Sequence, residues 1–124
     1  MEGIHSKEDN LIEFLDSFAR DMRSLDNPDV TKDSKRNVLI FETDEQAIEA
    51  SMHDDHAVIE YVRESEDGLG ITFKVSNKGV EIRGVLKGDS LENETSRLRK
   101  FLDDLKNKGI ESEVLTYIED LLNN

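Results

Sequence analysis

The chain has 124 residues and a formal net charge of -13, from 29 Asp and Glu residues against 16 Lys and Arg residues. This charge disfavours direct binding to nucleic acid or to anionic membranes, because both need Lys and Arg to displace counterions from phosphates. The chain has no Cys, which excludes disulfides, zinc ribbons and thiol nucleophiles. Chains of this length typically form one domain, so we predict a single domain over residues 1–124 with a flexible tail at residues 1–7.

The N-terminal residues and the length of the apolar runs bear on the cellular location. The first residues lack the charged and apolar segments of a signal peptide. The longest apolar run, Val38–Phe41, is far shorter than a membrane-spanning helix requires. We therefore expect a cytoplasmic protein that does not contact membranes.

The first predicted element is a helix that starts at Glu8 and ends before Asn27-Pro28, because the residue before a proline is disfavoured in the helical conformation. Its apolar stripe has the three- and four-residue spacing of one helix face and consists of Leu11, Leu15, Phe18, Met22 and Leu25. Packing of this stripe on the sheet of its own chain is the simpler interpretation. The stripe also spans two heptads, so a homodimer seam is possible.

The next segment is predicted as loop, strand and helix. Residues 27–36 are polar and read as a loop, and Val38–Phe41 reads as a short buried strand. Thr43 and Gln46 have the spacing of a capping box, which predicts a short helix from there to near His53. The inward side of that helix would carry Ala47, Ile48 and Met52.

Three strand-like runs follow at residues 57–64, 69–75 and 80–86, and Asp67-Gly68 and Asn77–Gly79 supply turn signals between them. They predict an antiparallel meander. Two amphipathic helices, at about 91–107 and 111–122, close the chain, with Gly109 as a cap between them. The order α-β-α-β-β-β-α-α predicts an α+β fold in which three to four mainly antiparallel strands are covered on one face by helices.

One cluster could bind a metal. His53-Asp54-Asp55-His56 offers nitrogen and oxygen donors suited to Zn²⁺, Ni²⁺ or Mn²⁺. Four consecutive residues cannot all converge on one ion from a regular helix, so a polar connection is the simpler interpretation. A metal-binding protein or metal-dependent enzyme that uses these four residues is the alternative function.

The acidic charge is concentrated in residues 42–55, which contain no Lys or Arg. The six acids there are Glu42, Asp44, Glu45, Glu49, Asp54 and Asp55. On the predicted helix, Glu45 and Glu49 lie one turn apart on the outer side. Carboxylates can occupy the site that a basic protein offers to phosphates, and electrostatic steering speeds such association.

These observations lead to one functional expectation. The protein is expected to be a non-enzymatic inhibitor, immunity-type or regulatory factor without a cofactor, which binds a basic protein partner through the six acids. The acidity could also serve only solubility or adaptation to salt. A structural homo-oligomer without an acidic site is a further alternative, joined through the first helix or an open sheet edge.

Overall fold

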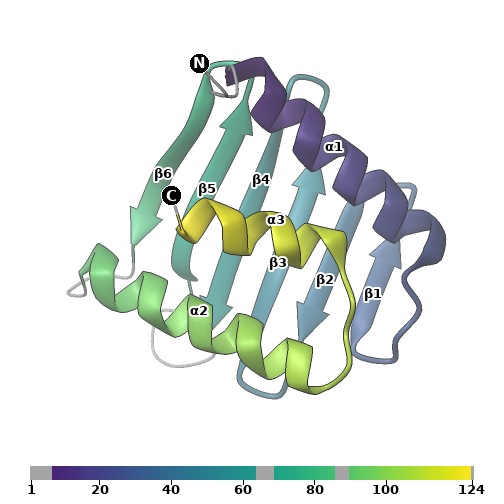
Figure 1. Cartoon of the computed structure of the whole chain (residues 1–124), viewed down its shortest axis with the longest axis vertical. Helices are drawn as coiled ribbons and strands as arrows, with labels where there is room; N and C mark the ends of the chain where they lie inside the picture. Colours follow the sequence, from purple (N-terminus) through teal and green to yellow (C-terminus); the bar gives the residue numbers. More distant parts are fainter. Residues whose placement is uncertain (1–6, 64–68, 86–89, 124) are drawn as a thin grey trace.

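Six strands pair in chain order to form one antiparallel sheet, and three helices lie on one side of it (Figure 1). The computed structural model describes residues 7–63, 69–85 and 90–123, and the counts refer to these residues. The helices are α1 (Lys7–Ser24), α2 (Leu91–Asn107) and α3 (Glu113–Leu122). The strands are β1 (Val30–Asp33), β2 (Val38–Glu42), β3 (Gln46–Met52), β4 (His56–Arg63), β5 (Leu69–Ser76) and β6 (Gly79–Val85).

The sheet has a covered face and an open face. Successive side chains in a strand point to opposite sides, and β2 and β4 alternate between buried and partly exposed positions accordingly. The covered face, which packs against the three helices, carries Leu39, Phe41, Ile48, Ala50, Ile59, Tyr61, Ile71 and Phe73. The open face is the opposite side, over which Figure 1 shows no helix.

The α+β class and the antiparallel meander at the centre of the chain are confirmed. The sheet is larger than predicted, with six strands in place of three or four. The predicted order α-β-α-β-β-β-α-α is wrong in two places: residues 27–36 contain β1, and the predicted second helix is a strand. The third run begins at Gly79 and forms the edge strand β6; residues 64 and 86, predicted as strand ends, lie outside the described residues.

The predicted helix near residues 44–53 is β3, which pairs with β2 on one side and β4 on the other. Thr43 and Gln46 do bond to each other, but they close a hairpin turn: the Thr43 amide donates to the Gln46 carbonyl over 2.9 Å. Ile48 and Ala50 are fully buried at a spacing of two. Pairing on both sides outweighs the intrinsic helical preference of Ala and Glu in this segment.

The two C-terminal helices match the prediction closely. Ser90 caps α2 and Ser112 caps α3, each accepting a hydrogen bond from the backbone amide three residues later. Gly109 has a φ of +84° and donates its amide to the Lys106 carbonyl, so it ends α2 as expected. Helix α3 begins at Glu113, two residues later than predicted.

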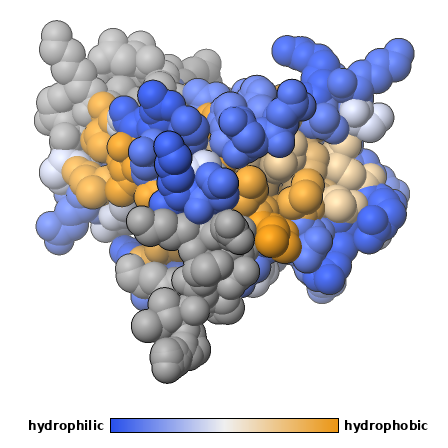
Figure 2. Space-filling model, turned by 90° about the horizontal axis from the view of Figure 1, so that it is seen from above, coloured by the Kyte–Doolittle hydropathy of each residue, from blue (hydrophilic) through white to orange (hydrophobic). Residues whose placement is uncertain are grey.

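The stripe of α1 packs against its own chain, with one exception. Phe18 and Leu25 are buried, and Leu11 and Met22 pack against the core. Leu15 is 46% exposed, and the residue buried in its place is Phe14. The space-filling view from above, onto the end where α1 lies, shows hydrophobic residues at the surface between hydrophilic ones (Figure 2).

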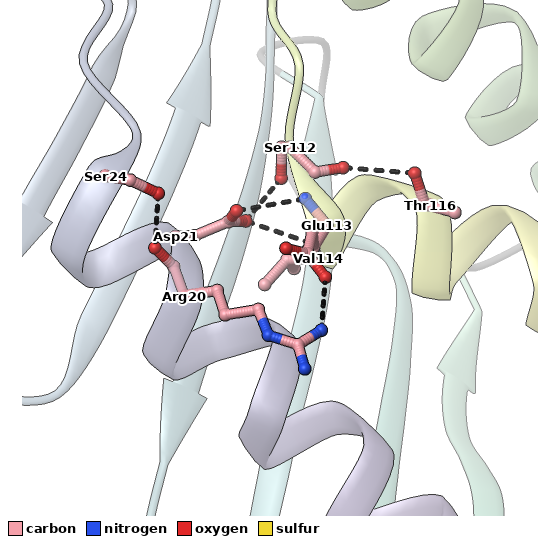
Figure 3. A network of polar contacts seen from close by, with 7 residues as sticks. All are labelled: Arg20, Asp21, Ser24, Ser112, Glu113, Val114 and Thr116. Carbon is pink, nitrogen blue, oxygen red and sulfur yellow. Dashed lines mark hydrogen bonds and ion pairs between the residues drawn. The ribbon is translucent and has the colours of Figure 1, made fainter.

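Helix α3 is attached to α1 by a buried carboxylate. Asp21 accepts hydrogen bonds from the Ser112 hydroxyl over 2.5 Å and from the amides of Glu113 and Val114 over 3.0 Å (Figure 3). The free amides of a helix N-terminus favour a negative charge, so this position suits an aspartate. Arg20, one residue earlier, forms an exposed ion pair with Glu113.

A second buried carboxylate lies between α2 and the sheet. Glu94 is fully buried, and its Oε1 accepts hydrogen bonds from Arg63 and Arg97, each over 2.8 Å. Its Oε2 lies over Gly70 of β5, where a Cβ would be only 2.7 Å away. The two guanidinium groups balance the charge of a carboxylate that would otherwise be costly to bury.

Among the described residues, no helix combines the length and the apolar composition that crossing a membrane requires.

Candidate functional site

The acidic segment forms the turn between β2 and β3 at one end of the sheet. Glu42 ends β2, and Asp44 and Glu45 lie in the turn. All three side chains are exposed. The bond from the Thr43 amide to the Gln46 carbonyl closes the turn and holds these three carboxylates at the tip of a hairpin.

The turn lines one side of an open groove with a volume of about 680 Å³. The start of β1 and the C-terminal half of α2 line the other sides. The carboxylates of this acidic groove belong to Asp29, Glu42, Asp44, Glu45 and Asp104. Phe101 adds an apolar ring, and Lys108 is the single basic residue of the described lining. The groove therefore has a strong excess of negative charge.

A shallower hollow of about 210 Å³ lies beside the same turn. Its lining includes Glu42, Ala47 and Val62, which are aligned across β2, β3 and β4 on the open face. The acidic turn thus has a concave surface on each side. One faces α2, and the other leads onto the open face.

Glu49 does not lie in the groove. It was predicted one helical turn from Glu45, but it points from the middle of β3 onto the open face and is partly exposed. Its direct neighbour across the strand pair is Glu60 of β4. The structure therefore places this member of the predicted acidic set beside a different carboxylate.

Asp54 and Asp55 lie in the turn between β3 and β4, at the opposite end of β3. A seven-residue strand is about 20 Å long, so these two exposed acids are well separated from the acidic groove. Asp55 Oδ1 is 2.8 Å from His56 Nδ1, and this hydrogen bond lowers the pKa of the Asp55 carboxyl. The six predicted acids thus fall in three places: three at the groove, one on the open face and two in this turn.

The candidate metal ligands His53, Asp54, Asp55 and His56 all belong to that second turn. The His53 amide donates to the His56 carbonyl over 2.8 Å, and the two imidazole rings are stacked with centroids 4.6 Å apart. Within the described part of the chain, no three His, Asp or Glu residues gather in a way that could hold a metal ion. Metal binding stays a prediction, which metal analysis of the purified protein would test.

Three acids of interest could not be located from the sequence. Asp29, directly before β1, and Asp104 of α2 line the groove, and their proximity to the turn arises only through folding. Asp104 is an exposed residue of the amphipathic helix α2, and its spacing alone does not distinguish it from other solvent-facing acids. The alternation along the predicted strand at residues 57–64 assigns Glu60 to the open face. Its pairing with Glu49 follows only once residues 46–52 are known to form a strand.

Comparison of the chain with protein-family models, with curated proteins and with solved structures found no match. The geometry and charge of the groove itself are therefore the features that bear on function.

Proposed function

We propose that this protein binds a protein partner through the acidic groove and acts as an inhibitor, immunity-type factor or regulator without catalysing a reaction. The observation that supports this proposal is the groove of about 680 Å³ with five carboxylates and one lysine in its described lining. A partner loop or helix that carries Lys or Arg would complement this charge. A cytoplasmic location is part of the proposal.

The physical advantage of such a groove is the rate and selectivity of association. A concave surface lined by one sign of charge focuses the electrostatic field and attracts oppositely charged ligands. The chain as a whole is also negative, at -13, so the long-range field and the local groove favour the same class of partner. Nucleic acid would be repelled by both.

The proposal can be tested by affinity capture from source cells with three baits: the wild type, the groove variant Asp44→Lys/Glu45→Lys, and the control Asp103→Lys/Glu111→Lys. The control residues are exposed and absent from the described groove lining. Each double variant replaces two carboxylates by two lysines, so both change the net charge by the same amount. We expect the wild type and the control to retain the same partner at low salt and the groove variant to lose it.

Capture should also weaken strongly at about 0.5 M salt, where exposed charges are screened within a few Å. If the groove variant retained the same proteins as the wild type, the groove would not be the binding site.

A further inference from the structure

The open face of the sheet is more apolar than a solvent-facing surface requires. Side chains there that are only partly exposed include Val38, Ile40, Ala47, Val58 and Val62. These residues come from three adjacent strands and lie in three neighbouring rows of the register. Val38 and Val58 flank Ser51 in one row, Ile40 is beside Glu49 in the next, and Ala47 is beside Val62 in the third. An antiparallel sheet with a purely solvated face would carry mostly polar residues at these positions.

Unpaired polar groups cross the middle of this apolar area. The strand register aligns Ile40, Glu49, Glu60 and Thr72 in one row across β2 to β5. Glu49 and Glu60 are direct neighbours, with Cβ atoms about 5 Å apart, and like charges in that arrangement destabilise a sheet. Neither carboxylate forms an ion pair or a side-chain hydrogen bond within the described residues. The buried Oγ1 of Thr72 has no hydrogen-bond partner there either.

The basic residue of β5 on this face is Lys74, and its position favours other carboxylates. Lys74 lies directly opposite Glu81 of β6 and is only a diagonal neighbour of Glu60. Its charge also contributes to the lowered pKa of Asp55. Within the described residues the Glu49–Glu60 pair therefore has no ion-pair partner, and like charges in directly opposite positions disfavour the sheet.

A primary ammonium or a guanidinium would complement this row. It supplies positive charge and several hydrogen-bond donors, whereas the row offers two carboxylates and a hydroxyl. The surrounding valines and isoleucine would contact the apolar residues on either side of such a cation. A helix fits the dimensions, because the row spans four strands, or about 14 Å, and a helix with its side chains is about 10 Å wide.

We propose that the open face binds an amphipathic helix of a protein partner, whose apolar side carries one Lys or Arg that enters between Glu49 and Glu60. This inference rests on the proposed function, since both assume a basic protein partner. It adds a second contact surface, connected to the acidic groove through the turn that ends at Gln46. A second copy of the chain is a poorer occupant, because two such faces would bring four carboxylates together.

The proposal predicts that stability and binding change in opposite directions. Glu49→Gln and Glu60→Gln each remove one of two repelling charges, so each should raise the melting temperature by about 2 to 4 °C. Each should also weaken helix binding about tenfold, because the cation loses one partner. The matched control is Glu81→Gln, which removes a carboxylate opposite Lys74 and should lower the melting temperature slightly without weakening binding.

Binding is measured with a synthetic helical peptide of about 18 residues that has leucines on one face and a lysine at the centre of that face. The comparison peptide carries Glu in place of this lysine. We expect the lysine peptide to shift the amide signals of β2, β3 and β4 in ¹⁵N-labelled protein, and the glutamate peptide to leave them unchanged.

Three results would overturn the inference: the absence of peptide binding, shifts confined to the groove residues, or equal affinity in Glu49→Gln, Glu60→Gln and wild type. Shifts confined to the groove would leave the proposed function intact, and the affinity capture described above tests that function independently. Dimerisation through this face, detected by sedimentation and abolished by Val58→Lys, would identify a second copy as the occupant and would also overturn the inference.

Discussion

Asp21 is the residue on which the position of α3 most depends. Its carboxylate is buried and accepts three hydrogen bonds, and two of the donors are first-turn amides of α3. Amides at a helix N-terminus have no partner within the helix, so a buried acceptor there satisfies groups that would otherwise be left without one. Figure 3 shows how the side chain reaches from α1 into that turn.

Asp21→Ala should therefore reduce the free energy of unfolding by about 3 kcal/mol, because a buried hydroxyl and two amides lose a charged acceptor. Asp21→Asn retains one oxygen acceptor, so its free energy of unfolding should lie between those of Asp21→Ala and the wild type. Urea unfolding followed by circular dichroism measures both. The control is Asp16→Ala on the same helix, which is exposed and should change the value by no more than about 0.5 kcal/mol. Equal losses at the two positions would contradict this role of Asp21.

At the scale of elements, the approach of α2 to the sheet depends on a residue without a side chain. Gly70 of β5 lies beneath Glu94, and a Cβ built there would lie 2.7 Å from Glu94 Oε2 and 2.9 Å from a ring carbon of Tyr61. Both neighbours are fixed: Glu94 by two arginines, and Tyr61 by complete burial and a hydrogen bond to Gln46. The glycine thus lets the buried carboxylate approach the strand.

Gly70→Ala should lower the free energy of unfolding by about 2 kcal/mol, because the added methyl group forces a packed carboxylate and a packed ring to move. Gly84→Ala is a matched control in the next strand, since a Cβ at that position meets no atom within 4 Å. We expect the control to be neutral or slightly stabilising. Thermal unfolding of both variants provides the comparison, and an unchanged melting temperature for Gly70→Ala would contradict the packing argument.

The elements also show which sequence patterns were reliable. The long amphipathic helices and the three central strands were predictable, because their apolar spacing extends over many residues and glycine-containing turns bound the strands. Strand β3 was not, because Ala47 and Ala50 are too small to reveal the alternation and Thr43 with Gln46 imitates a helix cap. Strand β1 has four residues and pairs on one side only, so its local pattern is weak.

The candidate site was predictable only in part, because some of its residues are close in sequence and others come together only through folding. Glu42, Asp44 and Glu45 are close in sequence and remain together in the turn. Asp29 and Asp104 join them through folding, and no local pattern could place residues so distant in the chain. Asp54 and Asp55 belong to the same acidic segment of the sequence, residues 42–55, but strand β3 carries them to the opposite end of the sheet.

On the scale of the whole molecule, both tyrosines of the chain are buried, and this determines its response to alkali. Burial raises the pKa of Tyr61 to about 12, and burial also raises the pKa of Tyr117 above its ordinary value. Well below pH 10 the tyrosines are protonated in the folded and unfolded chains alike, so their contribution to the free energy of unfolding is fully present. At higher pH the unfolded chain releases protons that the folded chain retains.

Stability should therefore fall as the pH rises from about 10 to about 12. Tyr61→Phe keeps the aromatic ring but removes one titrating hydroxyl, so its stability should fall less steeply over the same interval. Tyrosinate absorbance and far-ultraviolet circular dichroism, recorded together, test this. Ionisation of both tyrosines near pH 10 with the circular dichroism unchanged would contradict their burial.

The pairing of every strand with its neighbour in the chain has a consequence for how the protein folds. Each hairpin can form from residues that are close in sequence, so the sheet needs little loop closure and the chain should fold rapidly for a β-rich protein. The contacts between α1 and α3 differ, because Asp21 and Ser112 are 91 residues apart. We expect this closure to come late in folding, so that the two ends of the chain are joined only after the sheet between them has formed.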